Sequence, residues 1–246
     1  MRSIRLFVDA LLVPGLETVL PATVAAHATR VLRLKTGDAV TLFNGDGHEY
    51  PARLTAAGTR EVRAGVESRE SPPRESPLRI TLVQALARGE KMDWIVQKAA
   101  ELGVARIVPV ATERSEVKLD AARGGKRLQH WRAVAIAACE QCGRNSLPHI
   151  EAPAALTAWL DTNAVSQPTA RWMLHPEGAV RARDLAASLP AALELAVGPE
   201  GGFGATDLAA LRAHEFRELT LGPRILRTET AGVAALAALQ AVCGDL

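Results

Sequence analysis

A cluster of four glycines between residues 198 and 204 carries the strongest chemical signal in this sequence. It lies between an apolar strand and a helix and reads Val197-Gly198-Pro199-Glu200-Gly201-Gly202-Phe203-Gly204. Glycine adopts positive φ and lets a ligand approach closely, so the cluster predicts backbone N–H groups wrapped around a flat or anionic ligand. The spacing matches neither the Gly-x-Gly-x-x-Gly dinucleotide fingerprint nor a P-loop. A tight turn without a ligand is the weaker interpretation of so many glycines.

A second turn after a strand crowds charged residues into a short loop. It reads Leu219-Thr220-Leu221-Gly222-Pro223-Arg224-Ile225-Leu226-Arg227-Thr228-Glu229-Thr230-Ala231. Gly222-Pro223 turns the chain, and Thr228 or Thr230 can cap the helix that follows. Capping and surface ion pairing do not account for two arginines and a glutamate in so short a run, which therefore predicts chemistry.

A third polar run lies at the end of a basic helix and reads Ala138-Cys139-Glu140-Gln141-Cys142-Gly143-Arg144-Asn145-Ser146-Leu147-Pro148. Glu140 and Arg144 are four residues apart and could form a helical ion pair worth only ~0.2–0.5 kcal/mol. Gln141, Arg144 and Asn145 also offer donors and acceptors that can read a base edge. Both interpretations remain open from the residues alone. A fourth run, residues 89–104, predicts an amphipathic helix on which Lys98 and Glu101 can pair.

Charge is unevenly distributed, although the formal net charge is only +2. Residues 78–150 hold 12 Lys and Arg against 7 Asp and Glu, whereas residues 151–246 are net acidic. The basic excess is concentrated at Arg114, Lys118, Arg123, Lys126, Arg127 and Arg132. These side chains predict contact with several backbone phosphates if they share a face, and a solvated helix face otherwise.

The composition is that of a globular protein, with 48% hydrophobic residues, and excludes disorder for most of the chain. Cys139, Cys142 and Cys243 are odd in number and have no second pair at metal-ligand spacing, so we expect no metal and a reducing compartment. The N-terminal residues lack the apolar stretch of a signal peptide, and no apolar run of about 18 residues predicts a membrane span. A cytoplasmic location is therefore expected.

A proline-rich linker divides the chain. Ser71-Pro72-Pro73-Arg74-Glu75-Ser76-Pro77 can neither complete a sheet ladder nor continue a helix. The sequence thus predicts domains at residues 1–72 and 73–246. Alternating runs near 4–9, 39–43, 48–54 and 61–67 predict a small β barrel in the first domain. We expect one helix over residues 23–32, with Thr23 as its N-cap.

After the linker, apolar strands alternate with helices, the pattern of a mostly parallel sheet covered on both faces. The expected strands are Leu78–Ala85, Ala105–Val110, Ala170–Leu174, Leu193–Val197 and Phe216–Leu221. The expected helices are Lys91–Leu102, Gly125–Cys142, Ala154–Leu160, Arg181–Ser188, Thr206–His214 and Thr230–Val242, with Gly103 and Gly143 directly after two of them. In open α/β sheets ligands bind beyond the carboxyl ends of strands, so a site is expected at the turns that follow them.

Together these motifs resemble those of the RsmE family of SPOUT RNA methyltransferases, and the resemblance covers essentially the whole chain. Residues 198–202 and 221–231 are similar to the cofactor loops of SPOUT enzymes. Glu-Gln-x-Gly-Arg at 140–144 and Lys-Ala-x-Glu-Leu-Gly-Val at 98–104 narrow the resemblance to RsmE. Residues 5–8, 27, 30–33 and 37–38 look like its PUA-like domain. Cys142 departs from a common serine, and Ala28 from an expected polar residue.

The resemblance implies an α/β fold, with a SPOUT-type parallel sheet and a C-terminal trefoil knot, preceded by a small PUA-like β-barrel domain that binds RNA. It implies a homodimer whose active site draws on both subunits. It also implies S-adenosylmethionine (SAM) as cofactor, held in a bent form largely by backbone groups. The implied cofactor-binding residues are Leu174, Gly198, Pro199, Glu200, Gly201, Gly202, Leu221, Gly222, Leu226, Arg227, Thr230 and Ala231.

The reaction that the resemblance implies is methylation of N3 of one uridine in 16S ribosomal RNA, as free small-subunit RNA or in the 30S particle. That uridine must be unpaired or locally opened. A cation would favour the uracil anion and a carboxylate could accept the N3 proton. Arg224 or Arg144 with Glu229 or Glu140 is therefore our hypothesis for the catalytic pair. The implied RNA-binding residues are Arg5, Arg30, Arg33, Arg114, Lys118, Arg123, Lys126, Arg127, Gln141 and Asn145.

Two alternatives come from other classes of protein. A non-catalytic RNA-binding or ribosome-assembly factor would keep the basic helix and the barrel but would not need the glycine cluster. A nucleotide-dependent oxidoreductase would use that cluster for a pyrophosphate, but the fingerprint and its ribose-binding acid are absent. Binding of SAM, of a dinucleotide or of neither separates the three.

Overall fold

The chain forms two compact units in the computed structural model, which describes residues 4–58, 61–116, 121–163, 169–181, 184–185 and 191–246. Unit 1 comprises Met1–Glu75 and Cys139–Leu147, and unit 2 comprises Ser76–Ala138 and Pro148–Leu246. The predicted boundary after residue 72 lies three residues before this division. The prediction did not anticipate that residues 139–147 belong to unit 1. The division into domains at 1–72 and 73–246 stays a prediction.

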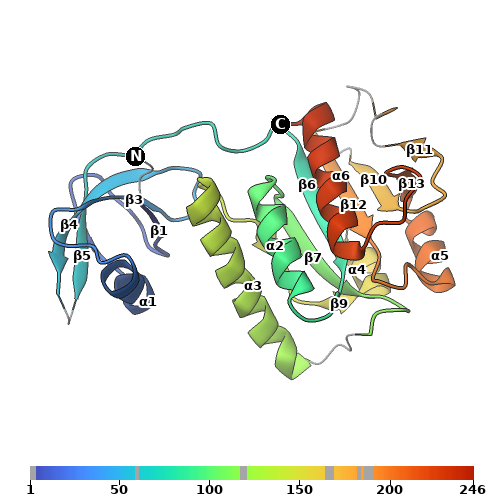
Figure 1. Cartoon of the computed structure of the whole chain (residues 1–246), viewed down its shortest axis with the longest axis horizontal. Coiled ribbons are helices and arrows are strands. Elements are labelled where there is room, and N and C mark those ends of the chain that lie inside the picture. The colour runs from blue at the N-terminus through green and yellow to red at the C-terminus, as the bar shows by residue number, and fades with distance from the viewer. Residues whose placement is uncertain (1–3, 59–60, 117–120, 164–168, 182–183, 186–190) are drawn as a thin grey trace. The chain divides into compact units, whose positions relative to one another are not determined.

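Unit 1 is built on a five-stranded sheet in the order β1-β3-β4-β5-β2 (Figure 1). Its strands are β1 (Arg5–Phe7), β2 (Glu17–Val19), β3 (Ala39–Phe43), β4 (Tyr50–Ala57) and β5 (Val62–Val66). β1 pairs with β3 in parallel, and the other neighbours are antiparallel. Alternate residues such as Ala52 and Leu54 point into the core, as the two-residue period predicts. Strand β2 was missed because three residues carry too little alternation.

The helix expected over residues 23–32 is present as two segments. Helix α1 (Ala22–Ala26) continues into the π-helical η1 (His27–Val31). The predicted N-cap was wrong, because Pro21 occupies that position and Thr23 lies inside α1.

Unit 2 contains an eight-stranded sheet in which every pairing among the described residues is parallel. The strands are β6 (Arg79–Ala85), β7 (Arg106–Ala111), β8 (His149–Ile150), β9 (Ala154–Ala155), β10 (Ala170–Leu174), β11 (Val180–Arg181), β12 (Ala192–Val197) and β13 (Arg217–Thr220). The order is β11-β13-β10-β12-β6-β7-β8, with β9 also on β7. The predicted parallel α/β fold is confirmed.

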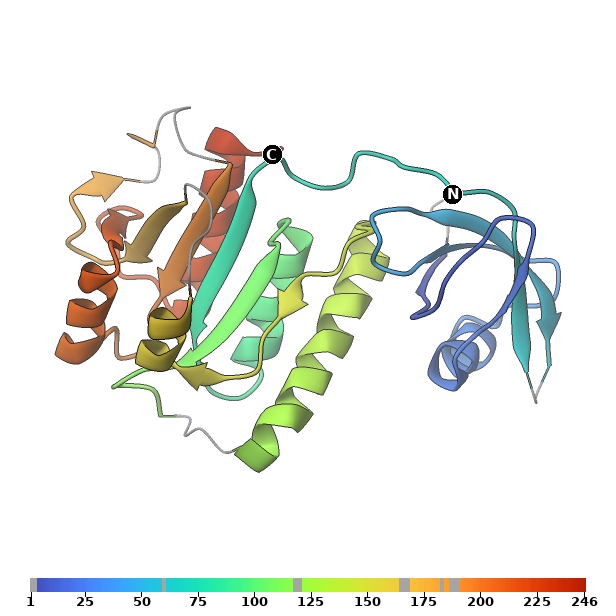
Figure 2. The same cartoon turned by 180° about the vertical axis from the view of Figure 1, so that it is seen from behind.

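Helices cover both faces of this sheet. They are α2 (Lys91–Glu101), α3 (Ala121–Cys142), α4 (Leu156–Thr162), α5 (Ala205–Ala213) and α6 (Thr228–Cys243). One apolar core joins the sheet to α2, α6 and the part of α3 in unit 2, and a second joins its other face to α4 and α5. Helices α2 and α6 cover the face of the sheet that is turned to the viewer in Figure 1, and α4 and α5 cover the opposite face, which Figure 2 shows. The central strands β6, β7 and β12 are mostly apolar because both of their faces are buried, with Gln84 and Glu194 as buried polar exceptions.

Several predicted helix boundaries were wrong by a few residues. Residues 154–155 form strand β9 instead of starting a helix. Helix α6 begins at Thr228, two residues before the predicted start at Thr230. Its N-cap is Arg227, whose side chain makes no capping hydrogen bond. The helix expected at Arg181–Ser188 lies largely outside the described residues. Gly103 and Gly143 follow α2 and α3 with φ of 78° and 96°, as expected for residues that end a helix.

None of the described helices combines the length and the apolar character needed to span a membrane.

Candidate active site

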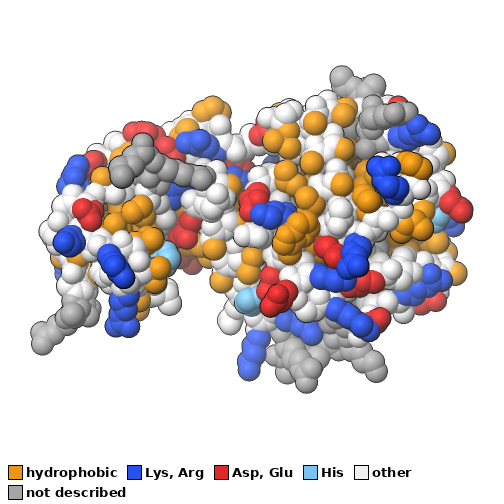
Figure 3. Space-filling view, in the orientation of Figure 1, with side chains coloured by type: hydrophobic (Ala, Val, Ile, Leu, Met, Phe, Trp, Pro, Cys, Tyr) orange, Lys and Arg blue, Asp and Glu red, His pale blue; other side chains and the backbone are white. Residues whose placement is uncertain are grey.

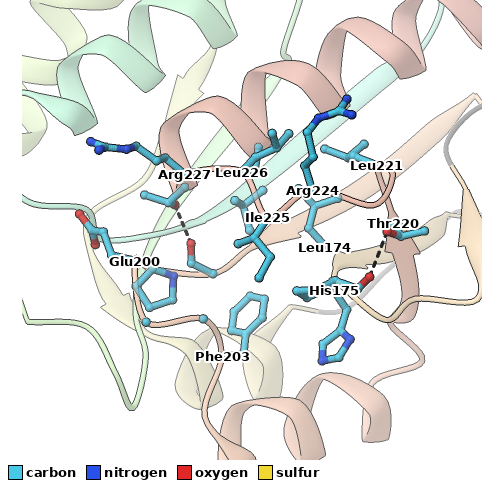
Figure 4. Close-up of a pocket in the computed structure, with 18 of the residues that line it drawn as sticks. Leu174, His175, Glu200, Phe203, Thr220, Leu221, Arg224, Ile225, Leu226 and Arg227 are labelled. Atoms are coloured by element: carbon cyan, nitrogen blue, oxygen red, sulfur yellow. Dashed lines mark hydrogen bonds between the residues drawn. The ribbon is translucent and has the colours of Figure 1, made fainter.

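A pocket of about 610 Å³ lies where the strands of unit 2 end, a volume within the roughly 300–1,000 Å³ of small-molecule sites. The turns after β10, β12 and β13 and the start of α6 form its walls (Figure 4). All the predicted cofactor-binding residues line it except Thr230, which is exposed on the first turn of α6. Sequence reasoning did not assign Lys91, His175, Pro176, Phe203, Thr220, Ile225 or Thr228, which also line the pocket.

The glycine cluster forms a tight turn on one wall. Gly202 has φ of +69°, and its N–H donates to the Pro199 carbonyl at 2.9 Å. A Cβ at Gly198 would lie 3.2 Å from the backbone nitrogen of Phe203, so a side chain there would require the loop to shift by a few tenths of an ångström. A Cβ at Gly202 would meet nothing within 4 Å. Space beside the turn is therefore open for a ligand to approach the backbone.

A buried hydrogen-bond chain fixes this turn to the sheet and to α6. The Thr228 hydroxyl donates to the Gly198 carbonyl at 2.6 Å, and the fully buried Gln84 amide donates to that hydroxyl at 3.2 Å. Thr228 thus does not act as the helix cap predicted for it. Sequence reasoning missed Gln84, although a polar residue inside the apolar run of β6 was a detectable signal.

The loop after β7 is a second anchor. Buried Asp207 accepts from the backbone N–H groups of Gly204 at 2.9 Å and of Glu113 at 3.1 Å. Glu113 in turn accepts from the Thr206 N–H at 3.2 Å. Arg114 donates to the Gly201 carbonyl at 3.0 Å and lines the pocket. Arg114 was predicted to bind RNA. Its hydrogen bond to Gly201 also places it beside the glycine cluster.

The loop that leads into α6 presents exposed side chains at the pocket. Arg224 and Arg227 are exposed, and Ile225 between them is 85% exposed. Figure 4 shows both guanidinium groups on the outer side of this loop, away from the ring of Phe203. Arg224, a predicted catalytic residue, therefore lies at the pocket with its charge directed outward.

A charged cluster occupies another part of the rim. The Lys91 ammonium donates to Glu200 at 2.8 Å and lies 3.7 Å from a carboxylate oxygen of Glu229. The hydrogen bond to Glu200 is the main cause that raises the Lys91 pKa. Burial opposes ionisation of Glu200, but hydrogen bonds, above all from Lys91, outweigh it and lower the Glu200 pKa. Glu229, predicted to be catalytic, does not itself line the pocket.

The third polar run lies in unit 1, where its side chains pack against that unit. Glu140 accepts from the Phe7 N–H at 2.9 Å, and burial raises the Glu140 pKa despite this bond. Arg144 is 7% exposed and pairs with Glu75 at 2.6 Å. Neither Glu140 nor Arg144 lines the pocket of unit 2. Their predicted catalytic roles stay predictions.

Arg5 and Asn145 belong to the same buried arrangement. Arg5 is 7% exposed, pairs with Glu49 at 2.8 Å and donates to the side-chain oxygen of Asn145. Its guanidinium also stacks 4.9 Å from the centre of the Phe43 ring. Asn145 is fully buried. The terminal guanidinium nitrogens of Arg5 and the side-chain oxygen of Asn145 are therefore used inside unit 1, because the fold brings them together.

The other predicted RNA-binding residues differ in exposure. Arg30, Arg33, Lys126 and Gln141 are exposed, and Arg127 is partly buried. Lys118 lies outside the described residues, and Arg123 falls in the first turn of α3. Figure 3 shows acidic and basic side chains intermixed near the start of α6 rather than one uniformly basic face. No described group of His, Cys, Asp and Glu side chains is arranged to hold a metal ion.

Two family models match the chain. Residues 74–240 match the RNA methyltransferase domain, and residues 20–67 match the RNA methyltransferase PUA domain. These two matches place the chain in the class of RNA methyltransferases, and the parallel α/β sheet with its glycine-lined pocket agrees with that class.

Individual relatives narrow this class. The chain is 31% identical to the ribosomal RNA small subunit methyltransferase E of Buchnera aphidicola, over 89% of this chain and 85% of that protein. The structure of the enzyme of that name from Neisseria gonorrhoeae bound to S-adenosyl methionine is 35% identical with a TM-score of 0.92, over 100% of both chains. A Legionella pneumophila protein with bound SAM is 39% identical with a TM-score of 0.93, again over 100% of both. The chain belongs to the ribosomal RNA small subunit methyltransferase E family.

Proposed function

We propose that this protein uses SAM to methylate N3 of one uridine in the 16S RNA of the small ribosomal subunit. The observation that carries the proposal is the pocket at the strand ends, whose glycine turn is fixed in place by hydrogen bonds from Thr228 and Arg114. Relatives 35% and 39% identical over their whole length hold SAM. The matched RNA methyltransferase and PUA domains support RNA as the substrate.

The residues present fit SAM. Leu174, Leu221 and Leu226 offer apolar surface for an adenine ring, and the turn at Gly202 leaves backbone open to polar groups. Bound there, SAM would supply an electrophilic methyl group on its sulfonium. The protein then has to hold the uridine N3 in line with that methyl and favour loss of the N3 proton.

Arg224 is the predicted catalytic cation that lines this pocket. We propose that it turns inward over the uracil when RNA binds. Glu229 and, from unit 1, Glu140 and Arg144 remain candidates for the other catalytic roles.

The proposal includes a homodimer whose active site draws on both subunits, a C-terminal trefoil knot, the 30S particle or its RNA as partner, and a cytoplasmic location. It also assigns residues 1–72 to RNA binding and residues 73–246 to methyl transfer. The matched PUA domain supports the assignment of RNA binding to the first segment, and the matched RNA methyltransferase domain supports the assignment of methyl transfer to the second.

Two measurements test the proposal. Titration calorimetry should show SAM binding, whereas a non-catalytic RNA-binding factor would give no heat. Small subunits from a strain that lacks the gene should gain one N3-methyluridine in 16S RNA when incubated with the protein and SAM. Absence of that product on both 30S particles and free RNA would contradict the proposed reaction.

The variant Arg224→Ala should lose turnover while SAM affinity stays nearly unchanged. Arg212→Ala is a matched control, since Arg212 is an exposed arginine on α5 paired with Glu218. Retained methylation in Arg224→Ala would remove Arg224 from the mechanism.

A further inference from the structure

Lys91 lies at the pocket edge and is held there from two directions. It is the first residue of α2, after the turn that follows β6. Glu200 approaches it from the glycine cluster and Glu229 from the first turn of α6. The charged groups that face its ammonium group are these two carboxylates and the more distant Arg227. Three elements far apart in the sequence thus converge on one lysine.

The ammonium group retains donor capacity toward the pocket. Lysine has three N–H donors. Among the described residues, only Glu200 lies within hydrogen-bond distance, because Glu229 is 3.7 Å away. Lys91 itself lines the pocket. At least one donor is therefore available to a group bound there.

Glu229 sits behind Lys91 rather than at the pocket surface. Its carboxylate is 17% exposed, and its Oε2 is buried without a hydrogen-bond partner among the described residues. A buried carboxylate oxygen is costly unless a cation compensates it, and Lys91 is the nearest cation shown. Glu229 is placed to hold Lys91, whereas Lys91 is placed to touch the substrate.

Stability alone is a poor explanation for the pair of Lys91 and Glu200. Both side chains are 32% exposed. Exposed ion pairs contribute only about 0–1 kcal/mol. An ammonium group aimed at developing negative charge in a partly enclosed site is worth far more to a reaction.

We propose that Lys91 is a catalytic residue that donates a hydrogen bond to a carbonyl oxygen of the target uracil, with Glu229 and Glu200 as positioning residues. Glu229 then has a positioning role in place of the catalytic role predicted for it from the sequence. This inference rests on the proposed function. The N3 proton leaves to solvent, and the electron pair left on N3 forms the bond to the methyl group. The electron pair of the broken methyl–sulfur bond returns to sulfur. Lys91 stays protonated and stabilises the negative charge that spreads onto the uracil carbonyl oxygens.

The test compares Lys91→Met, Lys91→Arg and Lys98→Met in the full-length protein. Lys98 is a matched control on the same helix, with the same 32% side-chain exposure and a carboxylate partner, Glu101, at 2.9 Å. We would measure kcat and KM on 30S particles lacking the modification from neutral to alkaline pH, SAM affinity by calorimetry, and melting temperature.

Lys91→Met should lower kcat at neutral pH by on the order of 10²–10³-fold, as removal of a donor to a developing anion does. SAM affinity should stay close to that of the wild type, and the melting temperature should fall slightly because Glu229 loses its nearest cation. The rise of kcat with pH should move to higher pH, because N3 ionises less readily without the cation. Lys91→Arg should recover part of the rate, and Lys98→Met should match the wild type.

A different pattern overturns the inference. If Lys91→Met weakens SAM binding but keeps kcat and its pH profile at saturating SAM, Lys91 only anchors the glycine cluster through Glu200. A lower melting temperature with the same pH profile would assign Lys91 a purely structural role. Failure of the wild-type protein to form N3-methyluridine would instead contradict the proposed function.

Discussion

Two motifs that the sequence marks as candidate sites are used in different ways. Residues 198–202 line the pocket of unit 2 largely with backbone, and their glycines leave space beside the turn. Residues 140–145 are held in unit 1 by their side chains, through Glu75, Arg5 and the Phe7 N–H. A run of glycines cannot fill the volume that its own turn encloses, whereas long polar side chains find partners and fill theirs. The difference explains why the first motif was the better guide to a site.

The largest expected effect is on the glycine turn. Gly202→Val forces a β-branched residue to φ of +69° and puts a side chain into the open space beside the turn. SAM affinity should fall by at least about a hundredfold, roughly 2.7 kcal/mol. Gly37→Val in unit 1 is the matched control, because Gly37 has φ of +94° and equally open surroundings. It should destabilise the protein similarly yet leave SAM binding intact. If calorimetry found equal losses of SAM affinity in the two variants, the glycine turn would have no special role in binding SAM.

The next effect tests the other motif. Arg144→Met removes a buried guanidinium from Glu75 and should lower the free energy of unfolding by about 2 kcal/mol. SAM affinity should not change, because Arg144 does not line the pocket. Urea unfolding and calorimetry measure the two quantities. Loss of methylation at unchanged stability would instead support the catalytic role predicted for Arg144 from the sequence.

A smaller effect is expected at the hydroxyl that fixes the glycine turn. Thr228→Val removes the bond to the Gly198 carbonyl and should cost about 1 kcal/mol. SAM binding should weaken about fivefold as the turn loosens. Thr230→Val, on an exposed residue two positions along, is the control and should behave like the wild type. Weaker SAM binding in Thr230→Val would instead support the prediction that Thr230 contacts the cofactor.

The smallest effect concerns pH. Burial raises the Glu140 pKa, so the folded state binds the proton more tightly than the unfolded state does. The ionised carboxylate therefore lowers stability at neutral pH, and this cost disappears as pH falls below the ordinary glutamate pKa. Glu140→Gln keeps an acceptor for the Phe7 N–H and should be slightly more stable than the wild type at neutral pH only. Melting curves at several pH values check this, and an advantage that grew on acidification would refute it.

Local patterns predicted much of the fold. The alternating strands β3, β4 and β5, the apolar strands β6, β7, β10 and β12 and the helices α2 and α5 were located to within about three residues, because apolar periodicity depends on the chain within a few residues. Short elements such as β2 and β9 were missed because they contain too few residues for a period. The division of residues 139–147 from the rest of the C-terminal half depends on contacts across the chain.

The sequence by itself determined the parallel α/β class and the turns that form the pocket, since glycine clusters and the ends of apolar strands are local features. Only the tertiary structure decided which side chains serve that pocket. Lys91 meets Glu200 across 109 positions, and Gln84 meets Thr228 across 144. The tertiary structure likewise brings together Arg5 and Asn145, 140 positions apart, as a buried pair. Such pairs form because a packed interior must satisfy its polar groups wherever the fold brings them, and no spacing along the chain specifies that encounter.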